Sequence, residues 1–129
     1  MSIVLATDLK PHSEKAEAYA MEYASAFDQP LHIISIITPG QDIDADVLRE
    51  HAESRLEDME RIGSSQGLDI VKVIEYGLPA ERVMNYAEEC GASVIIVGTS
   101  KKSSLSRVIL GSVSERIVKI AGTTVIVVR

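Results

Sequence analysis

The sequence predicts an α/β fold in which a doubly wound, five-stranded parallel sheet carries four helices. Apolar, β-rich runs alternate with segments of helical spacing, and this alternation gives the order βαβαβαβαβ. Most of the runs are apolar on both faces, which is typical of parallel sheets covered by helices on each side. The chain has 129 residues, enough for one domain with a single core.

The first predicted strand, helix and strand occupy residues 3–37. Residues 3–7 are an apolar strand, and a polar loop over residues 8–12 ends it. Ser13 is placed to cap a helix that stops before Gln29-Pro30. Residues 31–37 then form the second strand. The helical spacing predicts that the buried face of this first helix contains Ala16, Ala20, Tyr23 and Phe27.

The second predicted helix begins in an acidic cluster. Asp42, Asp44 and Asp46 suit the positive end of a helix dipole, so capping explains them better than a metal site does. Its inner face carries Leu48, Ala52, Leu56 and Met59. The strand that follows, residues 69–76, contains Lys72 and Glu75. These charges favour a position at an edge of the sheet.

The last two helices have clear boundary signals. Pro79 suits the first turn of the third helix, and Gly91 ends that helix. Residues 94–97 are the fourth strand. Ser112 and Glu115 have the spacing of a capping box and so predict the start of the fourth helix. The apolar side of that helix is predicted from Val113, Ile117 and Ile120.

Composition narrows the function. A net charge of -6 argues against nucleic acid and anionic membranes as partners, since both require basic patches. Every apolar run is well short of the roughly 18 residues that span a bilayer. The single cysteine, Cys90, excludes an internal disulfide and a cysteine metal cluster. We therefore expect a cytoplasmic protein.

The loop after the fourth strand is the candidate site. Such loops lie at the carboxyl ends of the strands, where ligands bind, and the N–H groups of the next helix favour an anion. The pattern Gly98-x-x-Lys101, nine residues, then Gly111-Ser112 resembles the signature of the universal stress protein family. In the nucleotide-binding branch of that family, a glycine stands where this chain has Lys101. The similarity covers the whole chain through Ile3-Val4-Leu5-Ala6-Thr7-Asp8, Leu31-His32-Ile33-Ile34, Gly77-x-Pro79 and Thr124-Val125-Ile126-Val127-Val128-Arg129.

The resemblance implies a single domain over residues 1–129 with a Rossmann-like fold, similar to that of the adenine nucleotide alpha hydrolases, and the strand order 3-2-1-4-5. In that order a crevice opens between strands 1 and 4. The family also implies a site there for ATP, with magnesium held through the nucleotide and Asp8. The contacts implied are Asp8, Ile33, Gly98, Lys101, Gly111, Ser112 and Ser114.

Most of these residues also have a purely structural explanation. Asp8 would form an Asx turn, and Ser112 would cap a helix without any ligand. Gly98 and Gly111 suit a phosphate loop and equally suit any tight turn that needs positive φ. Lys101 adds a cation beside phosphates, but its side chain makes a positive φ costly. Among the histidines, His12 lies near the crevice, where solvent exposure is expected for it, whereas His32 and His51 are structural.

Two hypotheses of different classes follow. In the first, the chain is a small stress-response regulator with a weakened ATP site and at most slow ATP hydrolysis, because the sequence contains no evident catalytic constellation. In the second, it is a dimeric protein-interaction module that no longer binds nucleotide. Either way we expect a homodimer through the last strand, between Thr123 and Val128, because an apolar strand at a sheet edge needs a partner.

Overall fold

Five parallel strands form one sheet in the order β3-β2-β1-β4-β5. This computed structural model describes residues 1–38, 40, 43–99 and 110–129. The predicted fold class and strand order are confirmed. The strands are β1 (Ser2–Ala6), β2 (Leu31–Ile37), β3 (Ile70–Tyr76), β4 (Ala92–Gly98) and β5 (Thr124–Val128).

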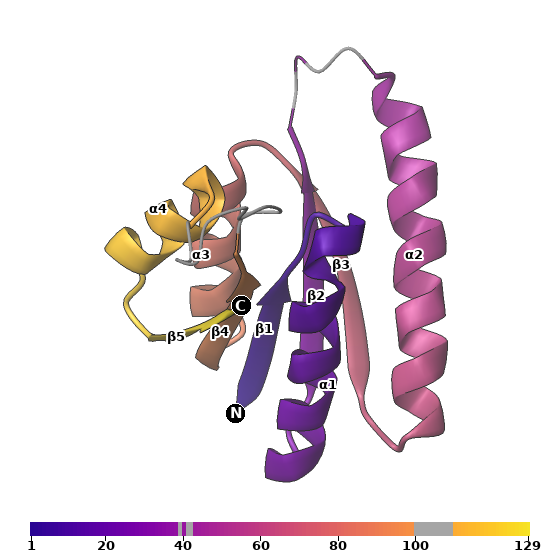
Figure 1. Cartoon of the computed structure of the whole chain (residues 1–129), viewed down its shortest axis with the longest axis vertical. Helices are drawn as coiled ribbons and strands as arrows, with labels where there is room; N and C mark the ends of the chain where they lie inside the picture. Colours follow the sequence, from indigo (N-terminus) through magenta and orange to yellow (C-terminus); the bar gives the residue numbers. More distant parts are fainter. Residues whose placement is uncertain (39, 41–42, 100–109) are drawn as a thin grey trace.

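The helices lie on both faces of the sheet (Figure 1). A short 3-10 helix precedes α1, and α1 and α2 pack together against one face, while α3 and α4 pack against the other. This division follows from right-handed crossovers on either side of the point where the chain reverses its direction across the sheet. The helices are α1 (Glu14–Phe27), α2 (Ala45–Ser65), α3 (Pro79–Glu89) and α4 (Ser112–Ile120).

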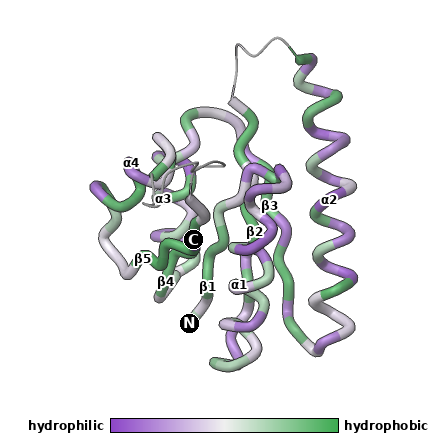
Figure 2. The backbone as a smooth tube through the Cα atoms, viewed as in Figure 1, coloured by the Kyte–Doolittle hydropathy of each residue, from purple (hydrophilic) through white to green (hydrophobic). Residues whose placement is uncertain are grey.

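Two hydrophobic cores lie between these layers. Successive side chains of β1 alternate between them, because a strand points its residues to opposite faces. Ile3 and Leu5 pack beneath α1 and α2, whereas Val4 packs beneath α3 and α4. In Figure 2, β1 and β4 have mainly hydrophobic colours, whereas hydrophobic and hydrophilic colours alternate around α2. Both faces of the central strands are therefore covered, as their apolar sequence predicts.

The inner face of α1 differs in part from its prediction. Ala16 and Ala20 are buried as expected, but Phe27 is exposed and Ala24 is buried in its place. Small side chains let α1 lie close to the sheet. Tyr23 is partly buried against the same core, as predicted, and its ring lies 4.5 Å from that of Phe27.

Several predicted boundaries are confirmed. Asp44 is the N-cap of α2, and its side chain accepts a hydrogen bond from the Asp46 N–H at 2.7 Å. Pro79 opens α3. β3 is an edge strand, and its Lys72 forms an ion pair with Glu60 of α2 at 3.0 Å. Among the described helices, none combines the length and apolar character needed to cross a membrane.

Candidate functional site at the carboxyl edge of β1 and β4

The candidate site lies where two adjacent strands end at the same edge of the sheet. Ala6, the last residue of β1, pairs with Val97, and β4 ends one residue later at Gly98. β1 also stops short of its other neighbour, because its pairing with β2 ends at Ile34 while β2 continues to pair with β3 through Ile37. The end of β1 therefore forms a step between two longer strands, as expected at a topological switch point.

Asp8 organises the loop that follows β1. Its Oδ1 accepts hydrogen bonds from the Lys10 N–H at 3.0 Å and from the Ser13 hydroxyl at 2.6 Å. Its Oδ2 lies 2.9 Å from Nε2 of His12. Burial alone would raise the pKa of Asp8, but the hydrogen bonds from Ser13 and Lys10 and the charge of His12 outweigh it and hold that pKa below its ordinary value.

These contacts change two expectations drawn from the sequence. Ser13 precedes α1 without a side-chain capping bond, because its hydroxyl is directed to Asp8. His12 is not an exposed side chain, because it is largely covered and held against Asp8. Asp8 thus forms the Asx turn that its structural explanation requires, and its side chain stays 45% exposed at the edge of the sheet.

A buried polar cluster beneath this loop was not expected from the sequence. The Thr7 hydroxyl donates a hydrogen bond to Oε2 of Glu17 at 2.8 Å and accepts one from the Leu9 N–H at 3.0 Å. Oε1 of Glu17 lies 3.4 Å from Nη2 of Arg55, on α2. Burial raises the pKa of Glu17 above its ordinary value, opposed by the bond from Thr7 and the charge of Arg55. The sequence contains one indication of this cluster, because Glu17 lies directly beside Ala16, a residue of the predicted buried face of α1.

The other side of the site is the junction of β4 with α4. The buried Ser114 side chain donates a hydrogen bond to the Gly98 carbonyl at 2.7 Å, which fastens the first turn of α4 to the end of β4. The predicted inner residue Val113 is exposed, and Ser114 occupies the inner face instead. The first N–H groups of a helix have no acceptor inside the helix, and those of α4 before Glu115 have none among the described residues.

The predicted capping box at Ser112 and Glu115 is wrong. Gly111 is the N-cap of α4, Ser112 is its first helical residue, and none of the described side chains caps this end. The Ser112 hydroxyl stands one position too late to act as the N-cap acceptor. Glu115 instead donates its N–H to the Gly111 carbonyl and pairs its carboxylate with Lys119 at 3.1 Å.

The two signature glycines do not use the backbone freedom expected of them. Gly111 has φ of -71°, and Gly98 is absent from the positive-φ residues of the described chain. A Cβ added at Gly98 would meet only the Ala16 side chain, at an ordinary contact distance of 3.5 Å. Lys101, the position that departs from the signature, lies outside the described residues.

Ile33 lies away from the edge where the other site residues meet. It pairs with Leu5 on one side and Lys72 on the other, and its side chain is fully buried. The strand β2 is thus paired on both sides at this residue. The part of β2 that is paired on one side only begins after Ile34 and includes Ile36, which sequence reasoning did not select.

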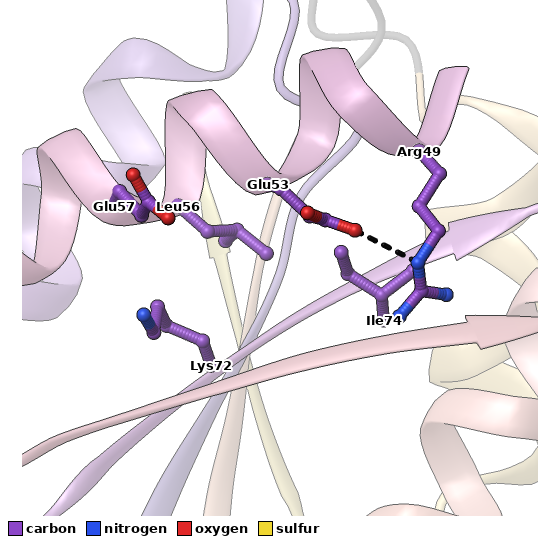
Figure 3. Close-up of a pocket in the computed structure, with 6 residues that line it drawn as sticks. All are labelled: Arg49, Glu53, Leu56, Glu57, Lys72 and Ile74. Atoms are coloured by element: carbon purple, nitrogen blue, oxygen red, sulfur yellow. Dashed lines mark hydrogen bonds and ion pairs between the residues drawn. The ribbon is translucent and has the colours of Figure 1, made fainter. Parts of the chain in front are cut away.

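Two hollows on the described surface lie elsewhere. One, of about 230 Å³, lies between α2 and β3, and Figure 3 shows the residues that line it. Three of its charged groups have partners, since Arg49 bonds Glu53 at 2.8 Å and Lys72 pairs with Glu60. The other, of about 220 Å³, lies near Asp28 and Asp69, where β2 and β3 begin. No group of three or more His, Cys, Asp or Glu side chains gathers as a metal site within the described ranges.

Solved structures similar to this one are universal stress proteins. One from Archaeoglobus fulgidus matches with a TM-score of 0.85 and 25% identity, covering 100% of this chain and 98% of that chain. A second from Archaeoglobus fulgidus, determined in complex with dAMP, matches with a TM-score of 0.80 and 23% identity, again covering 100% of this chain and 98% of that one. The second match shows a shared fold.

Sequence comparison gives the same family. Universal stress protein MJ0531 from Methanocaldococcus jannaschii is 29% identical over 137 residues, covering 98% of this chain and 81% of that protein. A sequence model of the universal stress protein family matches residues 1–129. The chain therefore belongs to the universal stress protein family.

Proposed function

We propose that this chain is a stress-response regulator that binds an adenine nucleotide, ATP with magnesium, at the carboxyl edge of β1 and β4. One observation carries the proposal: the Ser114 bond to Gly98 fixes the open end of α4 beside the end of β1, where Asp8 is exposed. Amide donors and a carboxylate thus meet at one edge. The dAMP complex of a protein with the same fold supports an adenine nucleotide as the ligand.

Each group has a role that suits its chemistry. The N–H groups at the start of α4 favour phosphate, because they have no acceptor inside the helix and carry the positive end of the helix dipole. Asp8 would accept hydrogen bonds from a ribose or hold a nucleotide-bound magnesium through its exposed side. The main chain of β2 beyond Ile34, unpaired by β1, offers donors and acceptors to the base.

Hydrolysis in such a site would be slow. Phosphoryl transfer to water needs a group that positions the attacking water. Among the described residues, the carboxylate at this edge is Asp8, and the proposal already assigns it to the ribose or the magnesium. The proposal is therefore one of binding and signalling, with ATP turnover as a minor property.

Lys101 provides the sharpest test. Calorimetry with ATP and magnesium would compare the wild type with Lys101→Ala, which removes the charge, and Lys101→Gly, which removes the charge and frees the backbone. If the site binds as it stands, Lys101→Ala should weaken ATP by roughly fivefold, the worth of one charge contact. Lys101→Gly should recover most of that loss because glycine permits positive φ.

The outcomes separate the two hypotheses. Binding by Lys101→Gly alone would mean that Lys101 has closed the site. Failure of both the wild type and Lys101→Gly to bind millimolar ATP with magnesium would reject the nucleotide proposal. The dimeric interaction module would then be preferred, and the half-buried apolar side chains of the edge strand β5 favour that alternative.

A further inference from the structure

Glu17 is a buried carboxylate on the face of α1 that packs against the sheet. It is 7% exposed, and its helix neighbours on that face are Ala16 and Ala20. A buried carboxylate is costly unless hydrogen bonds or ion pairs compensate it. Both oxygens of Glu17 are used, Oε2 by Thr7 and Oε1 by Arg55. The core alone gives no reason for a charged residue at this position.

The bond to Glu17 determines which way the Thr7 hydroxyl points. A hydroxyl has one proton, and in Thr7 that proton is donated to Glu17 at 2.8 Å. The oxygen lone pairs are then directed to the Leu9 N–H, which donates at 3.0 Å. Leu9 has φ of 62°, a left-handed conformation that is unfavourable for leucine, and its side chain is 4% exposed. The hydrogen bond that the Leu9 N–H donates to Thr7 therefore holds Leu9 in a strained turn.

Asp8 lies between Thr7 and Leu9 in the chain, so the direction of its side chain depends on the same turn. The charged groups near Glu17 come from three elements: Arg55 of α2, Glu14 of α1, and Asp8 of the loop itself. A chain of contacts thus runs from α2 through Arg55, Glu17 and Thr7 into the segment that presents Asp8.

We propose that Glu17 is a positioning residue, which through Thr7 holds the β1–α1 loop in the conformation that presents Asp8 to the nucleotide. The proposal rests on the function proposed above. It also makes α2 part of the support of the site, because Arg55 fixes the orientation of the Glu17 carboxylate. Glu17 itself does not touch the ligand.

The key variant is Glu17→Leu, with Glu22→Leu, on the exposed side of the same helix, as its matched control. Glu17→Leu removes the buried carboxylate together with its desolvation cost, and the Arg55 side chain that loses its partner is 30% exposed and can turn to water, so no buried charge is left unpaired. We therefore expect Glu17→Leu to unfold at the same or a higher temperature than the wild type. Exchange of the Leu9 amide hydrogen, followed by nuclear magnetic resonance, should nevertheless become about tenfold faster as one buried hydrogen bond loses its support. ATP affinity should fall by a similar factor.

An unchanged or higher unfolding temperature together with faster exchange of the Leu9 amide would identify a positioning role. If Glu17 were purely structural, its replacement would lower the unfolding temperature as well as speed the exchange. Thr7→Val and Thr7→Ser provide an independent pair if Glu17→Leu does not fold. Thr7→Val removes the acceptor of the Leu9 N–H, whereas Thr7→Ser keeps it and should restore both slow exchange and affinity.

Leu9 exchange and ATP affinity that stay unchanged in Glu17→Leu would overturn the proposal. If the wild type binds no nucleotide, the proposed function fails by itself. In that case Leu9 exchange in the same variants still decides whether Glu17 holds the loop, so the two failures are distinguishable.

Discussion

Within the part of the chain that the structure describes, the side chain of Asp8 bonds only residues of its own loop, namely Lys10, His12 and Ser13. Burial disfavours the ionised carboxylate, but the hydrogen bonds to its charged form prevail, so its pKa in the folded protein lies below 3.8. For an acid whose pKa is lowered by folding, the stabilisation is fully present above the unfolded pKa. It is lost as the pH falls through the folded pKa.

Asp8→Asn should therefore destabilise the protein in a pH-dependent way. At neutral pH we expect a loss of about 0.5–1 kcal/mol, below the usual worth of charged hydrogen bonds because the side chain is partly exposed. The loss should shrink as the pH falls through the lowered pKa of Asp8, where the carboxylate of the folded wild type becomes protonated and loses its charged hydrogen bonds. Urea unfolding at pH 3 to 7 would measure it, with Glu22→Gln on the exposed side of α1 as the control. A difference independent of pH would contradict the assignment.

The position of Asp8 could be predicted from the sequence, whereas the role of Glu17 could not. A polar residue directly after a buried strand must lie at the sheet edge, so the position of Asp8 follows from chain order alone. The role of Glu17 depends on which side chains meet it from other elements, Thr7 and Arg55, and helical spacing does not encode those partners. Val113 was predicted on the inner face of α4, but Ser114 lies there instead. A rotation of the helix by one residue about its axis decides which of the two side chains faces β4.

The contact of α2 with β3 depends on a glycine within the helix. Gly63 is buried, and a Cβ at this position would lie 2.7 Å from both Cγ1 and Cδ1 of Ile70. Real Cβ atoms do not approach carbon so closely, so Ile70 or the helix would have to move. Glycine thus allows the last turns of a 21-residue helix to lie directly on the start of an edge strand.

Gly63→Ala should lower stability although alanine is the better helix former. The helix preference favours alanine by about 1 kcal/mol, whereas overpacking costs about 1–3 kcal/mol. We expect a net loss of roughly 1 kcal/mol, seen as a melting temperature lower by about 3–6 °C. Gly122→Ala is the matched control, because a Cβ there meets nothing within 4 Å. A melting temperature that rises in Gly63→Ala would show that Ile70 relaxes without cost.

The order and bounds of the elements were largely predictable, and the helix starts were less so. Residues 31–37 were predicted as a strand and form β2, because a long apolar run between Pro30 and the next loop leaves few alternatives. At α4 the sequence offers Gly111 and Ser112 as neighbouring N-cap residues, and both types are common caps. The choice depends on where Ser114 meets Gly98, which is a tertiary contact.

Of the two edge strands, β3 and β5 are protected differently. β3 carries Lys72 and Glu75 and is bordered by α2. β5 consists of Thr124 followed by four half-buried apolar residues, and its outer side has no strand partner in the described chain. An apolar edge without charges is prone to pair with another strand. We therefore propose that β5 pairs with β5 of a second copy in solution.

Val125→Lys tests this proposal. Sedimentation equilibrium at micromolar concentration should give a dimer for the wild type and a monomer for the variant, because a lysine introduces charge beside the edge. Val47→Lys, on the exposed side of α2, is the matched control and should remain dimeric. Since Val125 also packs against the core beneath α3 and α4, circular dichroism must show that the variant is folded. A monomeric wild type would rule out the dimer.

The strand order was the one feature of the architecture that residues alone did not determine. Apolar runs and helical spacing predict the order of the elements along the chain, but they do not determine which strands lie beside β1 in the sheet. The resemblance to the universal stress protein family supplied 3-2-1-4-5, and the structure has this order. The adjacent strands β1 and β4 are far apart in the chain, since Ser2 pairs with Ala92 and Ala6 pairs with Val97.

The early end of β1 affects how this surface can change over evolutionary time. Beyond Ile34, β2 presents one side of its main chain to the step left by β1, and its N–H and C=O groups are the same whatever the side chains are. A ligand bound along that side would be recognised by peptide groups alone. Substitutions at Ser35 to Ile37 that preserve the strand would leave such recognition intact. Chains with little sequence in common could then keep one binding preference, and a scan of side-chain variants would find no residue responsible for it.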